Sequence, residues 1–268
     1  MRFHSLMNEV TGAECEVLIS EDWAQGRSTF GGLVGAFVLQ AMQKKVGTDR
    51  QLLDFNASFI APVSPTALRI KVTVLRAGGA VSQVQGQALQ DGEVRFLMLA
   101  TFGVPRTSAI SHGKALMPPV PEPDLCQKLH YLPKVTPEFI KHYDLFIAWG
   151  GLPFSGTRSE TFGGWVRLSE PEPEITLPHL VGYIDAWPPA TLPWPTVPCP
   201  ASSLSWSVQF LHPLPPVLPN EYCLYQARLD YTQDGYGFTR AQLWNAQGEL
   251  LAISQQTIAV FDRGASQA

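Results

Sequence analysis

The chain has 268 residues, of which 45% are hydrophobic and 16% are charged. This composition excludes a disordered protein and is typical of one large domain or two ordinary ones. The formal net charge is −4, so no basic surplus exists for a polyphosphate backbone and we expect no nucleic-acid partner. The longest apolar run is too short to cross a bilayer, and the N-terminus lacks an apolar signal core. We therefore expect a cytoplasmic protein with no membrane span.

Residues 31–45 are the first strong helical segment. The segment is apolar on almost all sides up to Gln40 and closes with two lysines, which suit a helix C-terminus. A helix that is apolar all round is predicted to be buried. Gly31 and Gly32 leave the amides at its start uncovered, which favours binding of an anion or an oxyanion. The two glycines could equally serve close packing.

Four strand-like stretches follow this helix, and each ends at proline, at glycine or at an Asp-Gly pair that is typical of a hairpin. They cover residues 53–61, 67–75, 81–89 and 94–104. The first half is therefore predicted to be one buried helix followed by an antiparallel meander. Prolines then crowd residues 106–137 without sustained periodicity, which predicts a linker.

The second half repeats this order. A helix is predicted over residues 176–187, followed by strands over 204–211, 222–231, 237–244 and 249–261. We interpret the chain as two degenerate copies of one helix-plus-meander unit. The predicted organisation is a first unit over residues 1–108, a proline-rich linker over 109–137 and a second unit over 138–268.

The ordered segments resemble those of the acyl-CoA thioesterase II type family and its thioesterase-like relatives. The residues that carry the resemblance are Thr29-Phe30-Gly31-Gly32, Ala57-Ser58-Phe59-Ile60-Ala61-Pro62, Asp185-Ala186-Trp187-Pro188-Pro189 and Ala252-Ile253-Ser254-Gln255-Gln256. The resemblance implies an α+β double hotdog, with two antiparallel sheets that each wrap around a central helix. It also implies an enzyme of lipid metabolism that hydrolyses acyl-CoA to free acid and CoA by an activated water. No cofactor or metal is expected, and a homo-oligomer is compatible with this reading.

In the family that the sequence resembles, a carboxylate, a hydroxyl and a glutamine of the second unit hold the water. The family's glutamine falls on Gln256, its aspartate on Ser205 and its threonine on Asp230. The carboxylate and the hydroxyl are therefore exchanged, and the resemblance implies a triad of Asp230, Ser205 and Gln256. An aspartate near a turn also commonly caps backbone amides, so Asp230 has this structural alternative.

Two further polar residues are candidates for the site. Asp185 lies near the end of the second predicted helix, where a carboxylate is unfavourable, so it either faces the cleft or is solvated. Asn56 lies on the strand after the first helix, where the family often has a polar site residue. We expect Asn56, Gly31 and Gly32 to bind substrate, and we keep Asp185 as the competing catalytic carboxylate.

Two other functions remain open at this point. A hotdog hydratase or dehydratase acting on an enoyl thioester usually employs an Asp/His pair, for which His179 and His212 are the nearest candidates. A non-catalytic acyl-binding protein is favoured by the serine at position 205. The histidines show no metal-ligand spacing, and the sequence has no motif of a serine hydrolase, a P-loop protein or a dinucleotide-binding protein.

Overall fold

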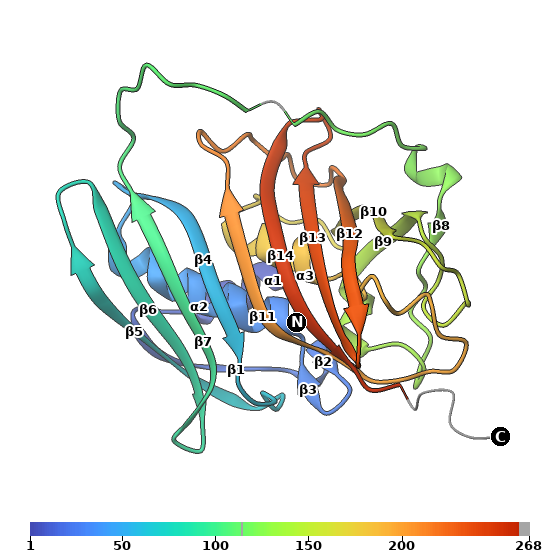
Figure 1. Cartoon of the computed structure of the whole chain (residues 1–268). Helices are drawn as coiled ribbons and strands as arrows, with labels where there is room; N and C mark the ends of the chain where they lie inside the picture. Colours follow the sequence, from blue (N-terminus) through green and yellow to red (C-terminus); the bar gives the residue numbers. More distant parts are fainter. Residues whose placement is uncertain (114, 263–268) are drawn as a thin grey trace.

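The computed structural model describes residues 1–113 and 115–262. Its main feature is a 12-stranded antiparallel sheet with the strand order β1-β5-β6-β7-β4-β11-β14-β13-β12-β10-β9-β8 (Figure 1). These strands are β1 (Glu14–Leu18), β4 (Gln51–Phe59), β5 (Ala67–Ala77), β6 (Val81–Gln90), β7 (Glu93–Gly103), β8 (Gln127–Lys128), β9 (Tyr143–Trp149), β10 (Thr161–Leu168), β11 (Ala201–Phe210), β12 (Cys223–Gln233), β13 (Tyr236–Trp244) and β14 (Leu250–Val260).

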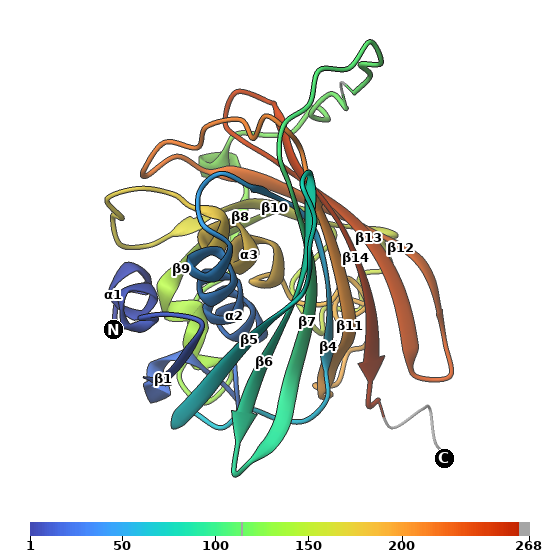
Figure 2. The ribbon, with the colours of Figure 1, turned by 90° about the vertical axis from the view of Figure 1, so that its left-hand side faces the viewer.

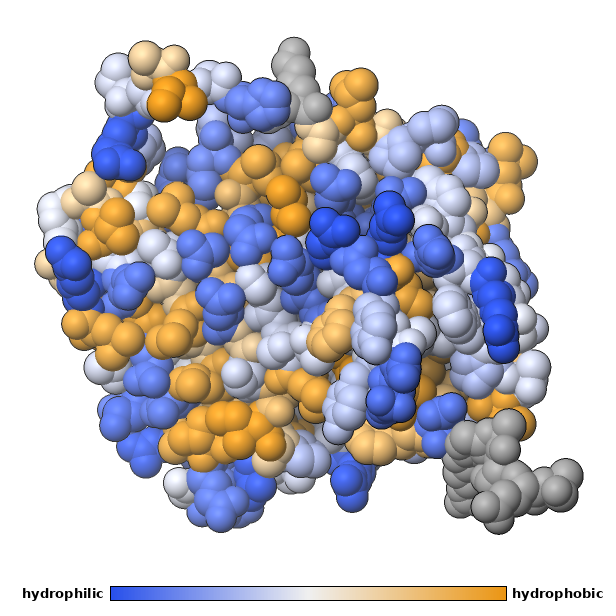
Figure 3. Space-filling view, in the orientation of Figure 1, coloured by the Kyte–Doolittle hydropathy of each residue, from blue (hydrophilic) through white to orange (hydrophobic). Residues whose placement is uncertain are grey.

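The three α-helices of the described residues lie on one side of this curved sheet (Figure 2). They are α1 (Phe3–Glu9), α2 (Gly31–Val46) and α3 (Leu177–Asp185), with 3-10 turns at η1 (Glu21–Trp23), η2 (Pro123–Leu125) and η3 (Glu138–His142). A separate hairpin, β2 (Ala24–Gln25) and β3 (Ser28–Thr29), precedes α2. Within residues 1–113 and 115–262, the opposite face of the sheet carries no helix (Figure 2). Hydrophilic and apolar side chains are interspersed on that face (Figure 3).

The predicted first helix is confirmed, and its environment explains why it is apolar all round. Residues 32–39 of α2 are all buried, because one side of the helix packs against α3 and the other against the sheet. A Cβ atom at Gly35 would lie 3.3 Å from Val181 of α3 and 3.5 Å from Trp206 of β11. A small residue here therefore permits the close approach of two helices and a strand.

The double hotdog fold is confirmed, with one refinement. The two predicted sheets join edge to edge where β4 pairs antiparallel with β11, so that Ala57 lies opposite Trp206. The two halves therefore share one continuous sheet, and each contributes one main helix to the concave side. All eight strands predicted for the two meanders are present within a few residues of their expected bounds.

Strands β9 and β10 were not predicted. Gly163 and Gly164 lie within β10 and have φ values of 141° and 156°. Because glycine is unfavourable inside a strand, a glycine pair in an apolar run makes the strand hard to predict from residue propensities. A Cβ atom at Gly164 would lie 1.9 Å from the carbonyl oxygen of Phe146, so the neighbouring strand requires glycine there. Helix α3 ends at Asp185, two residues before the predicted end at Trp187.

The expected linker over residues 109–137 contains β8, which pairs with β9 at one edge of the sheet. Its first part packs on the second half, because Trp165 donates to the carbonyl of Pro121 and Trp244 to that of Ala115. Residue 114 of this range and residues 263–268 of the expected second unit lie outside the described residues. Among residues 1–113 and 115–262, no helix combines the length and apolar character that a membrane crossing needs.

Candidate functional site

A cavity of about 590 Å³ opens at the N-terminal end of α2. Its lining comes from the β2–β3 hairpin, the start of α2, residues 59–63, the start of β7, the end of α3 and the loop after it, residues 200–204, and the end of β14 with the residue that follows it. Of the candidate site residues predicted from the sequence, Gly31, Asp185 and Gln256 line this cavity. The cavity thus combines the start of the first-half helix with the end of the second-half helix.

Asp185 and Gln256 form a hydrogen-bonded pair in this cavity. Gln256 Nε2 donates to Asp185 Oδ1 over 2.9 Å. On the other side of the carboxylate, a Cβ atom at Gly31 would lie 3.0 Å from Asp185 Oδ2. The carboxylate of Asp185 is therefore held between the amide of Gln256 and the first turn of α2, deep in the protein but open to the cavity.

This position changes the acidity of Asp185. Burial raises the pKa of Asp185 from 3.8 to about 7, although the Gln256 hydrogen bond and the Gly32 backbone amide favour the charged form. Desolvation is the dominant effect because removing a carboxylate from water penalises its ionised state. A carboxyl with a pKa near neutrality can accept a proton from water and release it again at physiological pH.

The first turn of α2 gives the cavity a positive pole. The helix has 16 residues and begins at Gly31, which lines the cavity, so the positive end of its dipole faces the cavity. Gly31 lines the cavity, and a Cβ atom there would lie 2.7 Å from the Phe59 ring. Gly32 is confined in the same way by Phe30. Both glycines are therefore required by close packing, while their backbone amides lie at the end of the helix that attracts negative charge.

The structure places Asp230 away from this site. Its carboxylate is exposed and accepts two hydrogen bonds from Arg240, at 2.6 and 3.0 Å, and this guanidinium lowers the pKa of Asp230. Arg240 pairs in register with Gln255, whereas Gln256 pairs with the buried Trp206. Because successive residues of a strand point to opposite faces, Gln256 faces inward and Asp230 outward. The expected contact between Asp230 and Gln256 is therefore wrong.

Ser205 and Asn56 are also outside the cavity. Ser205 is exposed next to the inward-facing Trp206, and Asn56 is exposed opposite Ser207. Neither belongs to the cavity lining. Hydroxyl-bearing residues do line the cavity, namely Ser28, Thr29, Ser202 and Ser203. Ser203 lies beside a bulge between Ser203 and Ser205 in the pairing of β11 with β14. The sequence analysis missed Ser203, since nothing distinguishes it from its neighbouring serines before the bulge is known.

The two histidines considered for an Asp/His pair are used elsewhere. The backbone amide of Thr176 donates to His179 Nδ1 over 3.0 Å, which caps the start of α3. His212 Nε2 lies 2.5 Å from the carbonyl oxygen of Leu52. Neither lines the cavity. Within the described part of the chain, no cluster of three or more His, Cys, Asp or Glu residues has an arrangement that could hold a metal.

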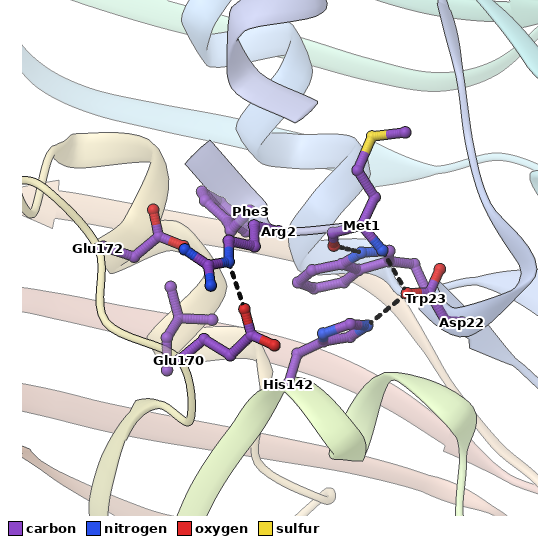
Figure 4. Close-up of a pocket in the computed structure, with 9 residues that line it drawn as sticks. Met1, Arg2, Phe3, Asp22, Trp23, His142, Glu170 and Glu172 are labelled. Atoms are coloured by element: carbon purple, nitrogen blue, oxygen red, sulfur yellow. Dashed lines mark hydrogen bonds and ion pairs between the residues drawn. The ribbon is translucent and has the colours of Figure 1, made fainter. Parts of the chain in front are cut away.

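A second hollow, of about 320 Å³, lies beside the N-terminus (Figure 4). Asp22 contacts the Met1 ammonium at 2.6 Å and His142 at 3.1 Å, and Arg2 pairs with Glu170 at 2.5 Å. Its charged groups thus largely pair with one another, and it contains none of the candidate site residues. We therefore take the larger cavity at the start of α2 as the candidate active site.

Comparison with protein-family models gives two matches. The acyl-CoA thioesterase N-terminal domain matches residues 19–103, and the acyl-CoA thioesterase C-terminal domain matches residues 117–260. The two matches cover both halves of the double hotdog. A search of curated proteins found no match.

Solved structures of similar fold cover nearly the whole chain. A hotdog-fold protein of unknown function from Alicyclobacillus acidocaldarius is 23% identical with a TM-score of 0.84, over 97% of this chain and 98% of that one. A provisionally assigned thioesterase II from Thermobifida fusca is 19% identical with a TM-score of 0.81, over the same shares. An acyl-CoA thioesterase II from Mycobacterium marinum is 20% identical with a TM-score of 0.70, over 94% of each chain. At these identities the comparisons establish the hotdog fold.

Proposed function

This chain belongs to the acyl-CoA thioesterase family, whose two domain models match both its halves, and we propose that it hydrolyses an acyl-CoA to the free acid and CoA with Asp185 as the general base. Thioester hydrolysis is the chemistry of the family. The acyl-CoA substrate and the roles of individual residues are our proposal. The observation that carries it is the Asp185–Gln256 pair, whose carboxyl has a pKa of about 7 beside the first turn of α2.

In the proposed reaction, Asp185 takes a proton from a water molecule as the water oxygen attacks the thioester carbonyl. Gln256 donates to Asp185 Oδ1 and the Gly32 amide also donates to the carboxylate, so a remaining lone pair of Oδ2, on the Gly31 side, would act on the water. The carbonyl oxygen becomes an oxyanion, and the C–S bond breaks when the tetrahedral intermediate collapses. The proton held by Asp185 is then available to the thiolate of the leaving group.

The start of α2 would stabilise the oxyanion. Backbone amides and the positive end of a helix dipole, aimed at a developing negative charge, are among the largest contributions to acyl-transfer catalysis. Gly31 brings this helix end to the wall of the cavity without a side chain in between. Ser203, on the same wall, would supply the hydroxyl that was expected at Ser205.

A panel of acyl-CoA thioesters tests this function. The wild-type protein should release free thiol from at least one member, and the Asp185→Asn variant should lose that activity. Crotonyl-CoA serves as the control for the hydratase alternative, since hydration would remove the enoyl absorbance without releasing thiol. Binding of acyl-CoA without release of thiol would instead support the non-catalytic acyl-binding alternative.

A further inference from the structure

We propose that Arg27 and Arg95 form an anion site at the mouth of the cavity, and that this site binds a phosphate of the substrate's coenzyme A portion. The inference rests on the proposed function and names the part of the substrate that the cavity mouth recognises. We call the pair Arg27 and Arg95 the cationic rim. The two residues are far apart in the sequence, and both line the cavity that contains Asp185.

Arg27 lies at the tip of the β2–β3 hairpin. The turn consists of Gly26 and Arg27, and Gly26 has φ +65°, which is the conformation that hairpin turns of type II′ require of their first central residue. The backbone amide of Thr29 donates to Val63 over 2.6 Å and fixes the hairpin beside the end of β4. Arg27 is exposed and makes no ion pair within the described residues.

Arg95 is held on the neighbouring wall by the backbone. Its carbonyl oxygen accepts from the amides of Ile60 and Ala61, at 2.9 and 3.1 Å, and both of these residues line the cavity. Arg95 Nε is buried and has no acceptor among the described residues. A buried donor without an acceptor costs free energy, and a bound anion would satisfy it.

The existing partners of Arg95 are exchangeable. Its Nη2 atom lies 3.1 Å from Glu93 Oε2 and 3.8 Å from Asp91 Oδ2, and these two side chains are 72% and 91% exposed. A surface ion pair of this kind contributes little free energy, because water solvates both charges. A phosphate entering from the cavity can therefore take the place of the Glu93 carboxylate.

The charges around the cavity favour an anionic ligand. Among the described lining residues, Arg27 and Arg95 are the cations and Asp185 is the acidic group, although the whole chain has a net charge of −4. A cleft with a local positive field attracts anions, and guanidinium groups match phosphate with paired hydrogen bonds. A thioester of CoA has its reactive carbonyl at one end of the pantetheine arm and its phosphates at the other, so one molecule can satisfy both Asp185 and the cationic rim.

Three thioesters with one acyl group test the cationic rim: acyl-CoA, acyl-4′-phosphopantetheine and acyl-pantetheine. The wild-type protein should have a higher kcat/KM for a phosphate-bearing thioester than for acyl-pantetheine, and this ratio should fall as salt is added. Arg27→Gln and Arg95→Gln should each lower the ratio by about 10- to 150-fold, as expected for the loss of a charge-assisted hydrogen bond. If acyl-CoA and acyl-4′-phosphopantetheine are both preferred over acyl-pantetheine, the cationic rim binds the 4′-phosphate, which acyl carrier proteins also have. If acyl-CoA alone is preferred, the cationic rim binds the phosphates of the nucleotide.

Arg228→Gln is the matched control, because Arg228 is exposed on β12 outside the cavity lining. It should leave the ratio unchanged. The proposal is overturned if the wild type shows no preference for phosphate, or if the Arg27 and Arg95 variants keep the wild-type ratio. A preference for acyl-pantetheine with a terminal carboxylate on its acyl group would also overturn it, since the rim would then bind the acyl portion.

Calorimetric binding of CoA and of pantetheine separates this inference from the proposed function. If the protein hydrolyses no thioester but binds CoA more tightly than pantetheine, and loses that difference in Arg27→Gln and Arg95→Gln, the phosphate site stands and the hydrolase proposal fails. If it hydrolyses thioesters but binds CoA and pantetheine equally in each form, the hydrolase proposal stands and the phosphate site fails.

Discussion

Asp185 and Asp230 are two carboxylates of the second half on opposite sides of the same sheet. On the concave side, burial raises the pKa of Asp185 to about 7. On the convex side, the Arg240 guanidinium beside Asp230 lowers the pKa of that carboxyl. The two residues have the same side chain, but only the first is in an environment that makes it a proton acceptor near neutral pH. The surroundings of the carboxyl therefore decide which aspartate is suited to catalysis.

The largest expected effect comes from removing the buried carboxylate. Asp185→Asn should lower kcat/KM for an acyl-CoA by about 10²- to 10⁴-fold, the range for loss of a general base. Asp230→Asn is the matched control and should remain within about twofold of the wild type, as is usual for an exposed residue away from a site. Free-thiol release measures both. The reverse outcome, with Asp230→Asn inactive and Asp185→Asn active, would assign the chemistry to the convex side.

The next effect concerns the amide that orients the buried carboxylate. Gln256→Ala should lower kcat/KM by about 10- to 100-fold, because the general base loses its fixed position. In the wild type, kcat/KM should rise with pH through a midpoint near pH 7, where Asp185 is half ionised, and level off above it. The Gln256 hydrogen bond favours the ionised form, so this midpoint should move to higher pH in the variant.

Gln255→Ala is the control for Gln256→Ala, because Gln255 is exposed on the outward face of the same strand. It should retain both the rate and the midpoint of the wild-type pH profile. An unchanged midpoint in Gln256→Ala would mean that the amide does not act through Asp185.

A smaller effect is expected at the start of α2. A Cβ atom at Gly31 would lie 2.7 Å from the Phe59 ring and 3.0 Å from Asp185 Oδ2, so Gly31→Ala should displace one of them. A displacement of this size should lower kcat/KM by about tenfold. Gly12→Ala is the control, since a Cβ atom at Gly12 meets nothing within 4 Å. Equal activity of the two variants would show that the first turn of α2 tolerates a side chain.

The smallest effect is on stability. Because the pKa of Asp185 is raised on folding, the folded state binds its proton more tightly than the unfolded chain does. The contribution of this group to stability therefore falls as pH rises from 3.8 to about 7. Asp185→Asn should increase the free energy of unfolding at pH 8 by about 1–3 kcal/mol and change it little near pH 3. Denaturant unfolding at both pH values measures this, and a variant that is less stable at pH 8 would contradict it.

Much of the fold was predictable because it depends on local patterns. Two helix-plus-meander units were predicted from the apolar segment over residues 31–45, the helix over 176–187 and eight strands bounded by Pro, Gly and Asp-Gly signals. The resemblance to the thioesterase family implied the double hotdog. The hotdog fold and the family are confirmed. The sequence did not predict β10, because its two glycines are explained only by the close approach of neighbouring strands.

The candidate site depended on information that the sequence does not hold locally. Gln256 was found by resemblance, but its partner was expected to be Asp230, and whether Asp185 faced the cleft or solvent was left open. Strand register decided this, because alternation along β14 turns Gln256 inward and Gln255 outward. On β11, Ser203 lines the cavity and Ser205, on the other side of a bulge, does not.

By itself, the sequence determined the two main helices, the eight strands of the two meanders and their duplication, since hydrophobic periodicity and turn residues act over a few positions. Only the tertiary structure decided which polar groups meet. Packing of α3 against α2 brings Asp185 to Gly31 and Gln256, and the β2–β3 hairpin brings Arg27 to the same cavity as Arg95. The physical reason is that side-chain direction in a sheet reverses at every residue. A single bulge or a one-residue shift in register therefore moves a functional group from the cavity to solvent.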